Sequence, residues 1–140
     1  MIYEKSCGAV IFHPGAGGKR QYLVELMRKG HRSLCKGHVE NNETEHETAA
    51  REIREETGLS VVFVDGFRET IEYSPYPGCT KTVVFFLAGS ESDVVKAQEE
   101  EVREIDWLPF EEASAALTFD SDRDVLRKAE TFLNRKGGSL

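Results

Sequence analysis

Apolar runs separated by glycine- and proline-containing segments divide the chain into strands and helices. Residues 4–13 (EKSCGAVIFH) and 21–28 (QYLVELMR) are rich in β-branched and aromatic residues, and they flank a glycine-rich segment, residues 14–20. This order predicts two strands joined as a hairpin with a long tip. Further strands are expected within residues 59–73 and 79–89, on either side of SPYPG, a sequence whose prolines and glycine are typical of a loop.

Helical features are clearest in residues 44–57 (TEHETAAREIREET). Thr44 and Glu47 match the S/T-x-x-E capping box that begins many helices. Gly58 follows at the place where a C-terminal glycine cap would lie. The segment therefore predicts a helix with defined ends.

The last third of the chain predicts one strand and two helices. Residues 101–108 (EVREIDWL) are expected to form the strand, residues 109–117 a short helix and residues 120–136 a longer one. The longer helix has one apolar face, made by Val125, Leu126, Ala129, Phe132 and Leu133. Strands and helices interleave without strict βαβ alternation, which favours an α+β fold, an α/β/α sandwich with a mixed sheet between helices. We expect a single domain over residues 1–140.

Composition and charge narrow the class of protein. The chain of 140 residues is 39% hydrophobic and 31% charged, which is typical of a globular domain. The sequence has no apolar run of membrane-spanning length and no signal-peptide pattern, so we expect a cytoplasmic protein that does not bind membranes. The formal net charge of −7 disfavours binding to extended nucleic acid. A phosphorylated ligand remains open if a metal ion accompanies it.

Three glutamates of the predicted helix lie on one face. Glu52, Glu55 and Glu56 stand at i, i+3 and i+4, a spacing that places their carboxylates within one turn. Such carboxylates repel one another, whereas Mg²⁺ binds through a few carboxylates together with waters and substrate phosphates. The alternative is a solvated acidic helix face. Residues 37–56 hold seven glutamates and two arginines, so much of the acidity of the chain is concentrated here.

The surrounding residues make the metal interpretation more specific. Residues 37–59, GHVENNETEHETAAREIREETGL, match G-x5-E-x7-R-E-U-x-E-E-x-G-U, where U is aliphatic, at every specified position. The segment resembles the Nudix box. The resemblance implies a Nudix fold and Mg²⁺- or Mn²⁺-dependent hydrolysis of a nucleoside diphosphate linked to another moiety. It makes Glu52, Glu55 and Glu56 metal ligands, and it gives structural roles to the remaining box residues Glu43, Arg51 and Gly58.

Family members differ in the carboxylate that activates the attacking water. The resemblance implies two candidates, Glu55 on the box helix and a glutamate on a loop before a late strand. In this chain the second candidate falls within residues 99–101 (EEE), and we choose Glu101, six residues before Trp107. Glu101 is also expected to be a metal ligand. The alternative is that the triple is simply an acidic loop.

Strings outside the box are similar to those of the diadenosine tetraphosphate hydrolases within this family. They are SCGAVIF, KGHVE, GFRETIEY, TKTVVFFLA and EVREIDWLPFEEA. By this resemblance, phosphate binding falls to Lys36, Gly37, His38 and Lys81, and stacking on an adenine falls to Tyr73 and Tyr76. For Tyr76, a loop tyrosine that covers the edge of the core is the alternative.

One segment departs from that pattern. Members carry an aromatic residue and then a proline before Lys-Gly-His, whereas residues 31–38 of this chain read HRSLCKGH. One wall of the base pocket must therefore be built differently. His31 and Arg32 are the candidates to replace it, by stacking or by a cation–π contact.

The leading hypothesis is a metal-dependent hydrolase that converts diadenosine tetraphosphate to ATP and AMP. A second hypothesis keeps the site but changes the substrate to a nucleoside triphosphate, to ADP-ribose or another nucleotide sugar, or to the 5′ end of an RNA. A third is a Nudix-fold module that senses a nucleotide without cutting it, which the intact carboxylate triplet disfavours. The expected partner is a small nucleotide, and the protein is expected to be a monomer or a homodimer.

Overall fold

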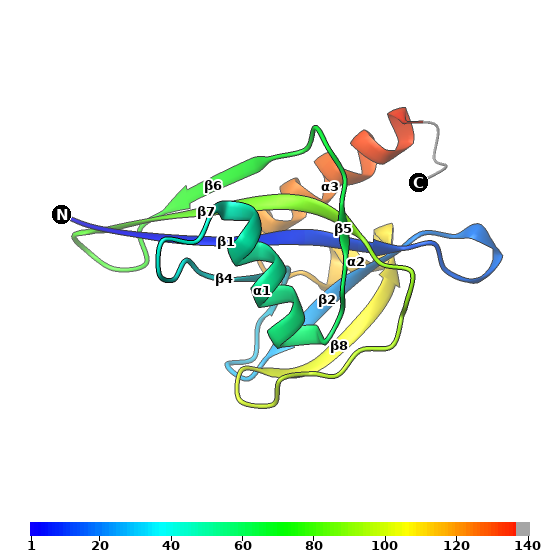
Figure 1. Cartoon of the computed structure of the whole chain (residues 1–140), viewed down its shortest axis with the longest axis horizontal. Coiled ribbons are helices and arrows are strands. Elements are labelled where there is room, and N and C mark those ends of the chain that lie inside the picture. Colours follow the sequence, from blue (N-terminus) through cyan, green and yellow to red (C-terminus); the bar gives the residue numbers. More distant parts are fainter. Residues whose placement is uncertain (137–140) are drawn as a thin grey trace.

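The computed structural model describes residues 1–136, apart from the side chain of Ala16. One mixed sheet contains all the strands, and helices pack on both of its faces (Figure 1). The elements in chain order are β1 (Ile2–His13), the 3-10 turn η1 (Ala16–Gly18), β2 (Gln21–Met27), β3 (Arg32–Ser33), β4 (Cys35–His38), α1 (Glu45–Thr57), β5 (Val62–Phe63), β6 (Glu69–Tyr73), β7 (Cys79–Gly89), β8 (Val102–Pro109), α2 (Phe110–Ala116) and α3 (Asp120–Arg135).

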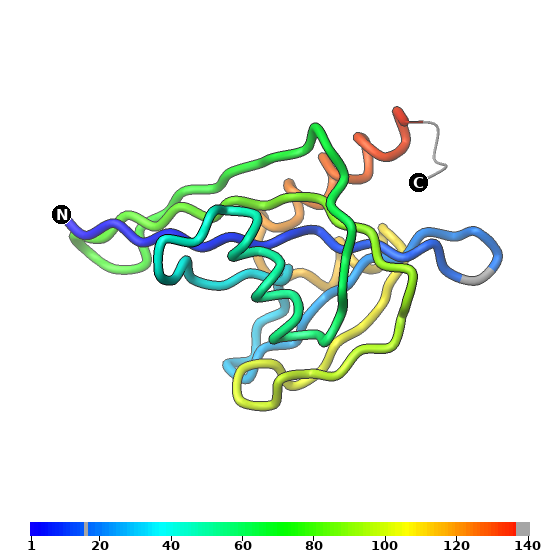
Figure 2. The backbone as a smooth tube through the Cα atoms, in the orientation of Figure 1, coloured from blue at the N-terminus to red at the C-terminus, as the bar shows by residue number. Residues whose placement is uncertain are grey.

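Strand β1 is the centre of the sheet and crosses much of the molecule (Figure 2). Along one edge it pairs in parallel with β7, from Ile2 opposite Cys79 to Phe12 opposite Gly89. Its other edge is divided, because β4 pairs antiparallel with Ser6 to Ala9 in the middle of the strand and β2 pairs only at the far end. Beyond that point β2 pairs with β3 instead, and along its whole length it pairs with β8. The predicted hairpin of β1 and β2 is therefore correct only next to its tip.

The alternation of side chains along β1 separates two apolar cores. Cys7, Ala9 and Ile11 pack on the face covered by α1. Val10 and Phe12 point to the opposite face, where the buried residues of α2 and α3 lie. The expected α+β sandwich with a mixed sheet between helices is confirmed, and α1 is held over the divided edge of β1.

Local signals place the ends of α1 correctly. Thr44 accepts a hydrogen bond from the Glu47 backbone amide, and the Glu47 side chain accepts one from the Thr44 amide, which completes the predicted capping box. Gly58 ends the helix with a φ of 78°, in the left-handed region that glycine tolerates. This helix buries Glu52 and Glu56 together with apolar residues, an arrangement that is costly unless the carboxylates are paired, protonated or bound to a cation.

Other elements differ from the expectations in detail. The short strands β3 and β4 were not predicted, and the expected strand within residues 59–73 is two separate strands, β5 and β6. The predicted final helix is confirmed as α3, with Phe132 only partly buried against Phe67. Within residues 1–136, no helix combines the length and the hydropathy needed to cross a membrane.

Candidate active site

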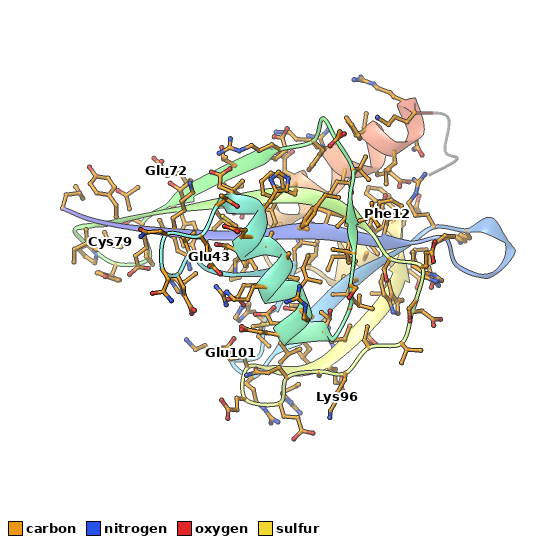
Figure 3. The ribbon with its side chains drawn as sticks, in the orientation of Figure 1. Phe12, Glu43, Glu72, Cys79, Lys96 and Glu101 are labelled. Atoms are coloured by element: carbon orange, nitrogen blue, oxygen red, sulfur yellow. The ribbon has the colours of Figure 1, made fainter. Side chains whose placement is uncertain are left out.

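Five glutamates line one cavity at the C-terminal end of α1, and four of them were predicted to hold a metal. Glu52, Glu55 and Glu56 reach this cavity from α1, and Glu101 reaches it from the loop before β8. The cavity has a volume of about 200 Å³, and its other lining residues are Gly37, His38, Glu40 and Gln98. Figure 3 shows Glu101 beside the last turns of the helix, and Glu43 near its first turn. The structure thus brings together the four residues predicted to hold a metal.

Backbone hydrogen bonds hold the Glu101 loop against the helix. The Gln98 amide donates to the Glu56 carbonyl (3.2 Å), and the Glu101 amide donates to the Gln98 carbonyl (3.1 Å). From the other side, the Arg28 amide donates to the Glu101 carbonyl (2.9 Å). These bonds fix the backbone at Glu101 relative to α1 and to the end of β2.

Arg51 connects the carboxylates with the loop before the helix. Its Nε donates to Glu43 (2.7 Å), and its Nη1 donates to Glu52 and Glu55, at 3.0 Å each. Its Nη2 donates to the His38 carbonyl (2.8 Å). The hydrogen bond from Arg51 is the main cause that lowers the pKa of Glu43 to about 2. Arg51, itself bound to Glu43, thus holds the side chains of Glu52 and Glu55 in place by charge-assisted hydrogen bonds.

The acidic cluster fits a divalent cation. Burial raises the pKa of Glu52, Arg51 opposes that rise, and the negative charges of Glu55 and Glu101 add to it. A hard cation would offset this repulsion, and oxygen atoms are the ligands that Mg²⁺ prefers. Glu52, Glu55, Glu56 and Glu101 are therefore suited to hold such an ion.

A second cavity of about 470 Å³ lies on the other side of β4 from the acidic cluster. Its walls come from β3, β4, β6 and the start of α3, and they consist of His31, Ser33, Lys36, Ile71, Glu72, Tyr73, Phe119, Ser121 and Asp122. Tyr73 and Lys36 were predicted to contact the substrate, and both line it. Because Lys36 faces this cavity and Gly37 faces the acidic one, consecutive residues of β4 connect the two.

Two aromatic side chains line this cavity near the segment that lacks the expected aromatic residue and proline. The rings of His31 and Phe119 are tilted against each other with centroids 5.7 Å apart, and both line the cavity. Arg32, the other candidate, is absent from the lining, and its amide donates to the Thr118 hydroxyl. Tyr76 is also outside the lining, and its hydroxyl donates to Glu4 (3.4 Å).

Basic side chains gather near β4. Lys81 is half-buried on β7, opposite Tyr73 of β6. Burial lowers the pKa of Lys81, and the positive charge of Lys36 adds to the effect. His38 lies exposed with its Nε2 3.7 Å from Glu4. The negative charge of Glu4 opposes the lowering of the Lys81 pKa, and Lys81 does not belong to the lining of either cavity.

Several residues of the two cavities were not found from the sequence. Asp122 is buried at the second cavity. It stands three and four residues before the buried Val125 and Leu126, a helical spacing that could have predicted its burial. Phe119 and Gln98 carry no pattern that identifies them. Glu25 interrupts an apolar strand, and that isolated charge was a further signal.

Comparison with known proteins identifies the family. The NUDIX domain family model matches residues 6–129. The chain therefore belongs to the Nudix family, and it is a Nudix pyrophosphohydrolase, as the box and the acidic cavity indicate.

Individual relatives give more detail. The chain is 33% identical to the asymmetrical bis(5′-nucleosyl)-tetraphosphatase of Rattus norvegicus over 140 residues, which covers 92% of this chain and 95% of that protein. The crystal structure of a binary complex of Caenorhabditis elegans Ap4A hydrolase matches with a TM-score of 0.85 and 28% identity, covering 94% of this chain and 98% of that chain. An 8-oxo-(d)GTP phosphatase of Mycolicibacterium smegmatis is 40% identical over 96 residues, which span 69% of this chain and 29% of that protein.

Proposed function

We propose that the protein hydrolyses diadenosine tetraphosphate asymmetrically, to ATP and AMP. The observation that carries this proposal is the connection of two cavities by consecutive residues of β4. Lys36 borders a cavity of aromatic side chains, and Gly37 borders the four carboxylates. A nucleotide that places its base in the cavity of aromatic side chains directs its phosphates toward the acidic cavity. The names of the rat and nematode relatives support the same substrate.

In this proposal Glu52, Glu55, Glu56 and Glu101 hold Mg²⁺ or Mn²⁺. A divalent ion there supplies charge neutralisation for the phosphate oxygens and lowers the pKa of a bound water. The cytoplasm, where Mg²⁺ and nucleotides are abundant, is the compartment that we propose for the protein.

The chain itself binds and orients the substrate. Tyr73 stacks on one adenine, because its side chain lines the same cavity as His31 and Phe119. Lys36, His38 and Lys81 neutralise phosphate charge, and the backbone at Gly37 lets the chain pass close to the phosphates. We assign no stacking to Tyr76, because that side chain lies against Glu4.

Between the two candidate bases we favour Glu101. The Glu55 carboxylate already accepts a hydrogen bond from Arg51 (3.0 Å). Among residues 1–136, no donor forms a hydrogen bond to the Glu101 carboxylate, so one of its oxygens can take a proton from water while the other binds the ion. Glu101→Gln should then reduce kcat with a loss of the acidic limb of the pH–rate profile. Glu55→Gln, the matched control on the same cavity, should reduce kcat through metal affinity and be partly rescued by excess Mg²⁺.

A nucleoside triphosphate is the second candidate substrate, because the Mycolicibacterium relative is named for one. The two proposals are separated by kcat/KM values measured with Mg²⁺ for diadenosine tetraphosphate, 8-oxo-dGTP, dGTP and ADP-ribose. We expect the dinucleotide to be preferred. A higher value for either triphosphate or for ADP-ribose would overturn the proposed specificity while leaving the Nudix chemistry intact.

A further inference from the structure

Behind the acidic cavity, three buried side chains from three different elements converge. They are Glu25 of β2, Cys35 of β4 and Glu56 of α1, and their ligand atoms all lie within 4.8 Å of one another. The Cys35 thiol donates a hydrogen bond to Glu56 Oε1, with a distance of 3.3 Å between sulfur and oxygen. Of the three, Glu56 alone also lines the acidic cavity.

Glu25 has no partner that explains its position. The residue is 0% exposed, and neither of its carboxylate oxygens has a hydrogen-bond donor among the described residues. An unpaired buried carboxylate is costly, and a second carboxyl beside it adds repulsion. A proton shared by Glu25 and Glu56 would neutralise only one of the two carboxylates. A cation would neutralise both carboxylates and the Cys35 thiolate together.

The distances and the donor types agree with a transition-metal site. In a tetrahedral zinc site, bonds of about 2.3 Å to sulfur and about 2.1 Å to oxygen place the two ligand atoms about 3.6 Å apart. The observed separation of 3.3 Å between Cys35 Sγ and Glu56 Oε1 requires only a small adjustment. A thiolate ligand favours borderline ions such as Zn²⁺ and Co²⁺ over Mg²⁺.

We propose that Glu25, Cys35 and Glu56 form a second cation site, specific for borderline divalent ions and distinct from the four-carboxylate cluster. Glu56 belongs to this site and to the outer cluster. An ion therefore enters through the acidic cavity, and Glu56 transfers it to the inner site. Occupation of the inner site withdraws Glu56 from the outer cluster, which gives the protein a means of responding to zinc. The proposal does not depend on which nucleotide the protein hydrolyses.

The test is a titration of the reduced protein with Co²⁺ in excess Mg²⁺ and without substrate. Absorption spectroscopy monitors each addition. We expect a thiolate-to-cobalt charge-transfer band that saturates at stoichiometric cobalt and disappears when Zn²⁺ is added. Saturating Mg²⁺ occupies the remaining outer carboxylates Glu52, Glu55 and Glu101, and Mg²⁺ forms no such band. A wild-type protein that shows no thiolate band under these conditions would overturn the proposal.

Variants identify the ligands. Cys35→Ser should abolish the band, and Glu25→Gln should weaken cobalt affinity by about 10-fold or more. Cys79→Ser is the matched control, because Cys79 is also a buried thiol but belongs to β7, and it should keep the band. A band that survives in Cys35→Ser, or is lost in Cys79→Ser, contradicts the assignment. The wild-type titration is decisive even if Cys35→Ser fails to fold.

Discussion

The carboxylate of Glu52 occupies the space in which a side chain at position 37 would begin. A Cβ built on Gly37 would overlap the carboxyl carbon and both oxygens of Glu52. The absence of a side chain at Gly37 therefore determines where this acidic group of α1 lies relative to β4. Gly8 is a contrasting case, because a Cβ there would overlap the backbone at Cys35 and Lys36.

Gly37→Ala should impair catalysis without unfolding the protein. The group that must move is the end of a flexible side chain, so Glu52 swings out of the cavity while the backbone stays in place. We expect a loss of activity of about 10- to 100-fold, comparable to the effect of disturbing the support of a metal ligand, and a melting temperature near that of the wild type. Gly8→Ala should instead lower the melting temperature. Wild-type kcat and Mg²⁺ dependence in Gly37→Ala would contradict the role of this contact.

Arg51→Lys should remove stability that the wild type has at neutral pH and loses in acid. Arg51 lowers the pKa of Glu43 to about 2, below the ordinary value of 4.5. A lowered carboxyl pKa contributes stability that is present above pH 4.5 and is lost as the pH falls toward 2. Lysine cannot reproduce the hydrogen bonds of the guanidinium group, so the melting temperature at pH 7 should fall by roughly 3–6 °C, allowing for partial solvent exposure.

Between pH 7 and acidic pH, the melting temperature of Arg51→Lys should fall less than that of the wild type. The reason is that the variant already lacks the stability that Glu43 loses on protonation. Arg54→Lys, on the exposed side of the same helix, is the control and should behave as the wild type. Identical pH profiles for Arg51→Lys and the wild type would show that the contact does not shift the titration of Glu43.

Glu25→Gln should have the opposite pH signature in metal-free protein. Burial raises the pKa of Glu25 to about 7, so the folded state binds this proton more tightly than the unfolded state. The associated stability is fully present below about pH 4.5 and is lost as the pH rises through about 7. Glutamine carries no charge, and the variant should therefore gain stability relative to the wild type at pH 8 but not at pH 4.5. Urea unfolding in EDTA at both pH values measures this difference, and parallel profiles would rule out a buried titrating Glu25.

Tyr73→Ala should weaken binding of the dinucleotide. Stacking of a base on an aromatic side chain contributes about 1–3 kcal/mol, which corresponds to a roughly 5- to 150-fold increase in KM. Tyr73→Phe keeps the ring and should keep KM. Steady-state kinetics with diadenosine tetraphosphate measures both, and an unchanged KM in Tyr73→Ala would place the adenine elsewhere.

Features set by local sequence were predictable. The ends of α1 follow from Thr44, Glu47 and Gly58, and the shared face of Glu52, Glu55 and Glu56 follows from helical spacing. The convergence of Glu101 on that face came from resemblance to the family, because no spacing along the chain links the acidic loop to α1.

Features that depend on distant segments were not predictable. The division of one edge of β1 between β4 and β2 results from strand pairing across the sheet, and neighbouring apolar runs suggested only a simple hairpin. His31 meets Phe119 although 87 residues separate them, and Glu25 meets Cys35 and Glu56 only in the folded protein. Both groups are products of tertiary packing.

Product analysis tests the central claim most directly. Diadenosine tetraphosphate is incubated with the protein and Mg²⁺, and the nucleotides are separated by chromatography, with Glu56→Gln as the inactive variant and Glu112→Gln, on the exposed surface of α2, as its matched control. We predict equal amounts of ATP and AMP from the wild type and from Glu112→Gln, and a rate at least about 100-fold lower from Glu56→Gln. ADP as the main product, no turnover by the wild type, or full activity in Glu56→Gln would contradict the account.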